Sequence, residues 1–138
     1  MKKTSILLIT LFFCSLSFAQ NVSLTVNFKF LNVEEGYDHN TKCIVYIDDE
    51  MIGESSEGLQ TKGNSFSVSV PTGEHQLKVV NMAEYEGKWE EHTIENNYSV
   101  DCIFEESHNF KKNEKLFLVF NLDDVMVAGW KKAPKVKK

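Results

Sequence analysis

The sequence predicts an all-β protein, a single immunoglobulin-like antiparallel β-sandwich of seven to nine short strands. Apolar and polar residues alternate with a period of two through most of the chain, which is typical of strands with one buried face. Turn-forming residues separate these alternating runs, and no run has a convincing helical period. Because we find neither a repeat nor a second domain, we expect one domain over residues 20–130.

The first half of the chain contains four expected strands. Residues 22–30 place valine, leucine and phenylalanine on one face and polar residues on the other, which indicates a half-buried strand. Residues 43–48 form an apolar run, and two aspartates then turn the chain into a short return strand, 50–55. Residues 65–70 alternate phenylalanine and valine with serine, as a strand with one solvated face does.

A tight corner is expected at Pro71-Thr72-Gly73. Proline cannot donate to a strand ladder, and glycine accepts a positive φ. The alternation resumes in 75–82 and continues more weakly in 88–95. After a turn formed by two asparagines, residues 98–104 alternate again and predict another strand.

The last two expected strands follow a polar loop. Residues 105–115 are almost all polar, which indicates a loop. Residues 116–122 are apolar on both faces, as in a central strand. Two aspartates then turn the chain into a final strand, 125–130.

Residues 1–19 have the pattern of a signal peptide. Two lysines precede an apolar run too short to span a bilayer. Ser17-Phe18-Ala19 supplies the small residues that a signal peptidase recognises, with cleavage expected before Gln20. The alternative is a lipoprotein anchored at Cys14, but Phe13 stands where that processing favours a small side chain. We therefore expect an exported chain, periplasmic or extracellular, with no transmembrane segment.

The composition is acidic. The formal charge is −5, and it becomes −7 when the two lysines of the leader are removed. Five lysines lie in residues 131–138, so the body before them carries −12, and the chain has no arginine. This balance argues against a nucleic-acid-binding domain. We expect the lysine-rich end to be a disordered, solvated tail, with contact to an anionic surface as the alternative.

Two cysteines, Cys43 and Cys102, remain after the leader. Each alternates with apolar residues, so both thiols are expected to point toward the core. In an exported protein an even pair suggests a disulfide, which would contribute roughly 4 kcal/mol by the chain-entropy argument. The alternative is two buried free cysteines.

Two segments resemble the PEGA domain family. "VYIDDEMIGES" (45–55) is similar to the strand–turn–strand opening of that domain, and "VPTGEHQLKV" (70–79) resembles its Pro-x-Gly corner with a histidine-led strand. Over residues 45–80 the resemblance implies a small extracytoplasmic sandwich used for surface binding or as an accessory module. It implies no catalytic residues.

The chain shows no recognisable catalytic or metal-binding frame. The four histidines share no metal-ligand spacing, and there is no Gly-x-Ser-x-Gly motif. We therefore expect no enzyme, metal or cofactor. The acidic runs 48–50 and 123–124 could bind calcium, but turn formation explains them more simply. For His75 we expect a structural role, with its ring bonded to a neighbouring turn.

Residues 82–98 contain the candidate ligand-binding residues Tyr85, Trp89, His92 and Tyr98, which stand among acidic and amide side chains. Aromatic faces flanked by carboxylates and amides suit a sugar-binding surface, and they also suit a protein-binding patch. The alternative is that Trp89 and Tyr98 belong to the core.

These observations predict an exported, non-catalytic binding or accessory module of a bacterial cell envelope. Its expected partner is a cell-envelope glycan or a protein. An exposed Trp89 on a flat strand face would favour the glycan. The other interpretation is an inhibitor or immunity-type protein that meets a basic partner through its acidic surface.

Overall fold

The computed structural model describes residues 20–136, so the expected signal peptide (1–19) and the last two lysines lie outside the described residues. This part of the chain contains ten strands and two 3-10 helices. Their bounds are β1 (Asn21–Leu31), β2 (Asn40–Ile47), β3 (Glu50–Glu54), β4 (Gly58–Leu59), η1 (Gln60–Lys62), β5 (Asn64–Pro71), β6 (Gly73–Tyr85), β7 (Lys88–Glu91), η2 (Ile94–Asn96), β8 (Ile103–Phe110), β9 (Glu114–Asn121) and β10 (Met126–Trp130). None of the helices in residues 20–136 is long and apolar enough to cross a membrane.

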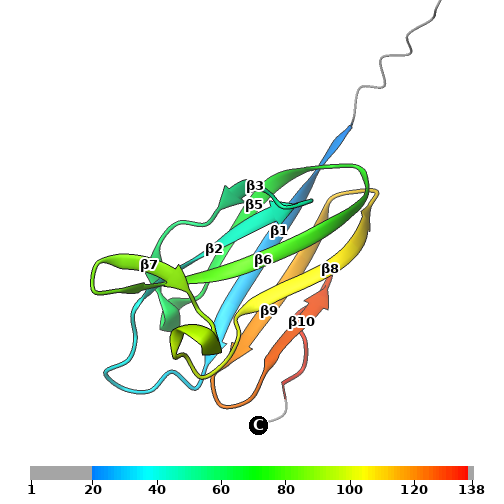
Figure 1. Ribbon diagram of the computed structural model, residues 1–138. Coiled ribbons are helices and arrows are strands. Elements are labelled where there is room, and N and C mark those ends of the chain that lie inside the picture. Colours follow the sequence, from blue (N-terminus) through cyan, green and yellow to red (C-terminus); the bar gives the residue numbers. More distant parts are fainter. Residues whose placement is uncertain (1–19, 137–138) are drawn as a thin grey trace, which may run out of the picture.

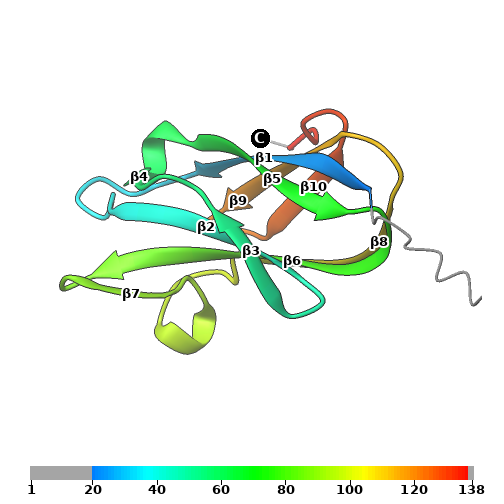
Figure 2. The ribbon, with the colours of Figure 1, turned by 90° about the horizontal axis from the view of Figure 1, so that it is seen from above.

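Two sheets pack face to face and confirm the expected all-β sandwich (Figure 1). The first sheet has the order β10-β9-β1-β5, and the second has the order β3-β2-β6-β7, with β4 paired to β2 and β8 paired to β6. Strands β8 and β7 pair with successive parts of one edge of β6, while β2 pairs with the other edge. Figure 2 shows the two layers from above.

The sandwich is not purely antiparallel, which corrects the sequence prediction. Strands β1 and β9 run parallel over Leu24–Leu31 and Glu114–Asn121. The reason is where β9 starts. Strand β8 ends at Phe110, which pairs with Gly73 at the start of β6. Strand β5, which comes directly before β6, ends at Pro71, which pairs with Asn21 at the start of β1. Strand β9 therefore begins at the same end of the molecule as β1 and runs in the same direction.

The core lies between the sheets and is built from alternate residues of the central strands. Leu24 and Val26 of β1 are fully buried, as are Leu77 and Val79 of β6. Full burial of such a side chain contributes about 1.5–3 kcal/mol. Strand β9 is buried on both faces over most of its length, as its continuous apolar run predicts.

The strand expected at 98–104 is displaced. Residues 97–102 belong to a loop, and β8 occupies residues 103–110, most of which had been expected to be a loop. Strand β8 is an edge strand with a solvated face, so its polar residues are compatible with pairing. Its inward-facing His108 is accommodated because the ring stacks on Trp130 at a centroid distance of 3.9 Å and bonds Glu114 at 2.7 Å.

The expected disulfide is wrong, because Cys43 and Cys102 are buried free thiols. Cys43 pairs with Asn81 of β6 on one side, and the Asn81 N–H donates to the Cys102 carbonyl on the other. Cys43 in β2 and Cys102, just before β8, therefore lie on opposite sides of β6. Two strand spacings separate their Cα atoms by about 10 Å, beyond the reach of a disulfide.

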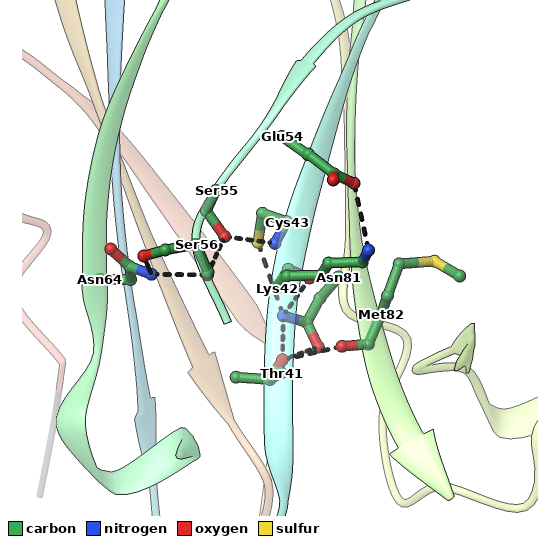
Figure 3. Close-up of polar contacts among 9 residues, drawn as sticks. All are labelled: Thr41, Lys42, Cys43, Glu54, Ser55, Ser56, Asn64, Asn81 and Met82. Atoms are coloured by element: carbon green, nitrogen blue, oxygen red, sulfur yellow. Dashed lines mark hydrogen bonds and ion pairs between the residues drawn. The ribbon is translucent and has the colours of Figure 1, made fainter. Parts of the chain in front are cut away.

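Asn81 ties β2 to β6 beside the Cys43 thiol (Figure 3). Its side-chain amide donates to Thr41 Oγ1 at 2.6 Å and lies 3.5 Å from the Cys43 sulfur. The Thr41 hydroxyl also lies 3.0 Å from the Met82 carbonyl. Because these hydrogen bonds satisfy the Asn81 side-chain amide, β6 can hold this amide fully buried.

The Pro71–Gly73 corner forms as expected, with Gly73 at a φ of 108°. The structural role expected for His75 is confirmed, because its Nδ1 lies 2.6 Å from Asp48 Oδ2 and its Nε2 lies 3.2 Å from the Thr72 carbonyl. The bond to Asp48 raises the pKa of His75. The Gln76 N–H, which donates to Asp48 Oδ1 at 2.9 Å, lowers the pKa of Asp48.

The first residues of the lysine-rich tail lie against the first sheet. The Lys131 N–H donates to the Lys115 carbonyl at 2.9 Å. Gly129 allows the chain to turn back closely, because a Cβ there would lie 2.6 Å from the Lys132 carbonyl oxygen.

Candidate ligand-binding site

A hollow of about 740 Å³ lies at the end of the sandwich opposite the Pro71–Gly73 corner. Figure 1 shows the segments around it near β7 and η2. Its lining comes chiefly from residues in segments 32–39, 84–99 and 122–123, which are far apart in sequence. A volume of this size suits a small ligand. We call this cavity the end hollow.

Local backbone geometry builds two of its walls. Glu86 and Gly87 both have positive φ and turn β6 tightly into β7. Residues 93–101 then leave the sheet as a closed loop, because the Cys102 N–H donates to the His92 carbonyl at 2.9 Å. Asn97, in the left-handed conformation, ends η2 within this loop. The hairpin and the loop thus project beyond the core as two walls.

His92 forms part of the floor and is only 2% exposed. Its ring stacks on Tyr98 at a centroid distance of 4.2 Å, with Phe30 at 5.7 Å and His39 at 5.9 Å. Burial, and to a lesser extent the charge of His39, lowers the pKa of His92 to about 4. Its ring is therefore neutral near pH 7, with one N–H donor and one acceptor nitrogen.

Three lining residues have buried nitrogen atoms without a hydrogen-bond partner among the described residues. These atoms are both ring nitrogens of His92, Nε2 of His39 and the side-chain amide nitrogen of Gln60, a residue that is 1% exposed. His39 Nδ1 lies 3.0 Å from the Tyr37 carbonyl, so it donates there and leaves Nε2 as an acceptor in the neutral ring. The floor thus presents both donors and acceptors.

The rim of the end hollow is aromatic and acidic. Tyr37 and Tyr85 are 72% and 60% exposed, which leaves their ring faces accessible. The Tyr98 hydroxyl donates to Glu90 Oε1 at 2.7 Å. Burial, and secondly this bond, raises the pKa of Tyr98, so the hydroxyl remains protonated. Glu84 pairs with Trp89, so its carboxylate lies on the outer face of the sheet, where Asn40 donates to Oε2 at 2.9 Å.

The structure brings together three of the four candidate residues, since Tyr85, His92 and Tyr98 all line the end hollow. Trp89 lies elsewhere. It pairs with Glu84, whereas its neighbour Glu90 pairs with the core-facing Ala83, so Trp89 points to the outer face of the sheet. There it is half-buried, with Lys42 Nζ 4.7 Å from its ring centroid. It is not the exposed, flat aromatic surface that would have favoured a glycan.

Sequence reasoning missed most of the lining, including the aromatic and floor residues Tyr37, His39 and Gln60. All three lie outside the alternating runs, in segments that had been expected to be loops. The available signal was a tyrosine and a histidine close together in the polar stretch "EEGYDHN". Nothing in the pattern marked Gln60.

The carboxylates and histidines do not assemble into a metal centre. In residues 20–136 no group of three or more His, Cys, Asp and Glu side chains is placed to hold a metal ion. Asp48, in one of the two acidic runs, uses both carboxylate oxygens in the bonds to His75 and Gln76.

No family model matches the sequence, and no curated protein matches it either. Among solved structures, the chain is similar to one described as "Crystal Structure of Gram Negative Toxin", with 5% identity and a TM-score of 0.35 over 84% of this chain and 24% of that one. It is also similar to listeriolysin O, with 8% identity and a TM-score of 0.34 over 84% of this chain and 23% of that one. The chain thus spans about a quarter of the length of these proteins.

Proposed function

We propose that this protein is an exported, non-catalytic binding module whose end hollow binds a glycan. The observation that carries the proposal is the set of unpaired nitrogens on the floor, in His92, His39 and Gln60. A buried polar group without a partner costs about 1–3 kcal/mol, so a ligand that supplies partners binds favourably. Hydroxyl groups both donate and accept, which fits a floor that offers both functions.

The rim supports the same ligand class. The exposed ring faces of Tyr37 and Tyr85 offer apolar platforms for the C–H face of a sugar. The carboxylate of Glu90, already held by Tyr98, is placed to accept hydrogen bonds from hydroxyls. The leader pattern and the PEGA resemblance favour a role in the cell envelope, where such glycans occur.

The test is calorimetric titration of the mature chain with soluble oligosaccharides and peptidoglycan fragments, alongside Tyr85→Ala and Trp89→Ala variants. We expect Tyr85→Ala to weaken binding roughly three- to tenfold, because an aromatic contact contributes about 0.5–1.5 kcal/mol. Trp89→Ala should leave the affinity unchanged, because Trp89 lies on the other face. Absence of saturable binding to any of these glycans would overturn the proposal. If the affinity falls in Trp89→Ala and not in Tyr85→Ala, the glycan binds on the outer face of the sheet and not in the end hollow.

A basic protein is the second candidate partner. An open groove of about 860 Å³ has an apolar floor that includes Ile103, Phe104 and Met126, and its rim carries acidic residues. This charge pattern complements a partner segment that presents lysines and apolar residues. The probe is an extended peptide of alternating lysine and leucine, which should bind at low salt and lose affinity in Glu95→Lys. If it binds equally well to that variant, this candidate falls.

A further inference from the structure

The end hollow is strongly acidic. Its lining includes five acidic residues and no lysine. Glu84 pairs with Trp89 and shares its outer face, which leaves four carboxylates at the hollow, those of Glu34, Asp38, Glu90 and Asp123. They come from the β1–β2 connection, the β6–β7 hairpin and the β9–β10 connection, so negative charge surrounds the opening from several sides.

None of these carboxylates forms an ion pair within the described part of the chain. Its three ion pairs are Lys42–Glu54, His75–Asp48 and His108–Glu114, all outside the lining. The donors that do reach the lining carboxylates are neutral. Thr61 Oγ1 donates to Asp38 at 2.6 Å, in addition to the bond from the Tyr98 hydroxyl to Glu90. Such bonds orient a carboxylate and leave its charge in place.

The floor independently points to a ligand. His92 and Gln60 are both more than nine-tenths buried, both line the hollow, and both have polar atoms without a partner among residues 20–136. A ligand that bonds these groups would hold its remaining substituents between the rim carboxylates and the tyrosine faces.

We infer that the end hollow selects sugars that carry a protonated amine over N-acetylated sugars, and rejects sugars that carry a carboxylate. This inference rests on the glycan-binding function proposed above. An ammonium group has three donors for carboxylate oxygens and also interacts favourably with an aromatic face. A sugar carboxylate would instead face four like charges with no lysine in the lining.

The experiment compares three oligosaccharides of equal length at slightly acidic pH: glucosamine, N-acetylglucosamine and galacturonate oligomers. We expect the glucosamine oligomer to bind roughly five- to tenfold more tightly than the N-acetylated one, with the advantage shrinking at high salt. The galacturonate oligomer should show no saturable binding.

Two variants remove charge from the rim with little change in shape. Glu34→Gln and Asp123→Asn alter exposed carboxylates at the hollow, and Glu57→Gln alters an exposed carboxylate outside its lining. The double variant Glu34→Gln/Asp123→Asn should lose most of the preference for the amine over the N-acetylated oligomer. Glu57→Gln should retain the preference.

The outcomes separate the inference from the proposed function. Equal affinity for the amine and the N-acetylated oligomer, or tight binding of galacturonate, overturns the charge selectivity and leaves glycan binding standing. If neither glucosamine nor N-acetylglucosamine oligomers nor the peptidoglycan fragments bind, the proposed function fails, and the inference fails with it.

Discussion

Two histidines at opposite ends of the sandwich are in opposite electrostatic states. His75, near the start of β6, has both ring nitrogens bonded, and its bond to Asp48 raises its pKa. His92, beside the far half of β6, has neither ring nitrogen bonded within the described residues, and burial lowers its pKa to about 4. One end of the molecule is therefore satisfied internally, and the other is not.

This difference indicates which end has a role beyond folding. At the His75 end the polar groups serve the corner and the neighbouring turn, so nothing there calls for a ligand. At the His92 end each buried polar group without a partner lowers the free energy of unfolding by about 1–3 kcal/mol. Selection for stability alone would replace such groups with apolar ones. We therefore place the binding role at the His92 end and the structural role at the His75 end.

The largest expected effect is acid destabilisation through His92. In the unfolded chain its pKa is about 6.5, and in the folded protein it is about 4. Between these values the unfolded state binds a proton that the folded state does not, so stability falls as pH decreases. The difference in pKa corresponds to about 3 kcal/mol. Urea unfolding measured from pH 7.5 to pH 4 should show this loss.

The matched control is His92→Gln, which cannot titrate. Carboxylates also titrate toward pH 4, so the informative quantity is the difference between the two proteins. The variant should have a distinctly flatter pH dependence between pH 6.5 and 4. An unchanged slope would show that His92 is not held neutral by its surroundings.

At the other end, the contribution of His75 to stability should decrease as pH rises, which is opposite to the effect of His92. This contribution is smaller because Asp48 is exposed. His75, with a raised pKa, stabilises the fold below its unfolded value of 6.5, and this is lost as pH rises through the folded value. Asp48, with a lowered pKa, stabilises it above 3.8, and this is lost as pH falls through the folded value. The pair therefore contributes most between about pH 3.8 and 6.5.

His75→Asn tests this contribution. The Tm difference between wild type and variant should be largest near pH 5, no more than about 3 °C, and should shrink above neutral pH. A Tm difference that grows with increasing pH would contradict the raised pKa of His75.

The alternation of the sequence predicted the sandwich and the inward direction of most strand residues, because side-chain direction follows from strand geometry alone. It could not show which strands are neighbours. Cys43 and Cys102 do face the core, but on opposite sides of β6, with Asn81 between them. The parallel pairing of β1 and β9 was hidden for the same reason.

The candidate site was predicted only where it lies on or near a strand. Tyr85, His92 and Tyr98 were identified from their composition, and the structure gathers them. Trp89 separates from them because one residue along a strand reverses the face. Tyr37, His39 and Gln60 come from connections without a period, so only the assembled fold shows that they meet.

The smallest expected effect concerns the thiols at the midpoint of β6, between the two ends. A Cys43–Cys102 bridge would make the protein lose roughly 4 kcal/mol on reduction, whereas buried free thiols predict no change in Tm with reductant. Burial raises the pKa of Cys43 to about 12 and raises that of Cys102 as well, so neither forms the reactive thiolate near pH 7. Alkylating agents should label both thiols only after unfolding. A Tm that falls when reductant is added would show that Cys43 and Cys102 are bonded in solution. The placement of β6 between these two residues would then be wrong, and so would the comparison of the two ends that rests on it.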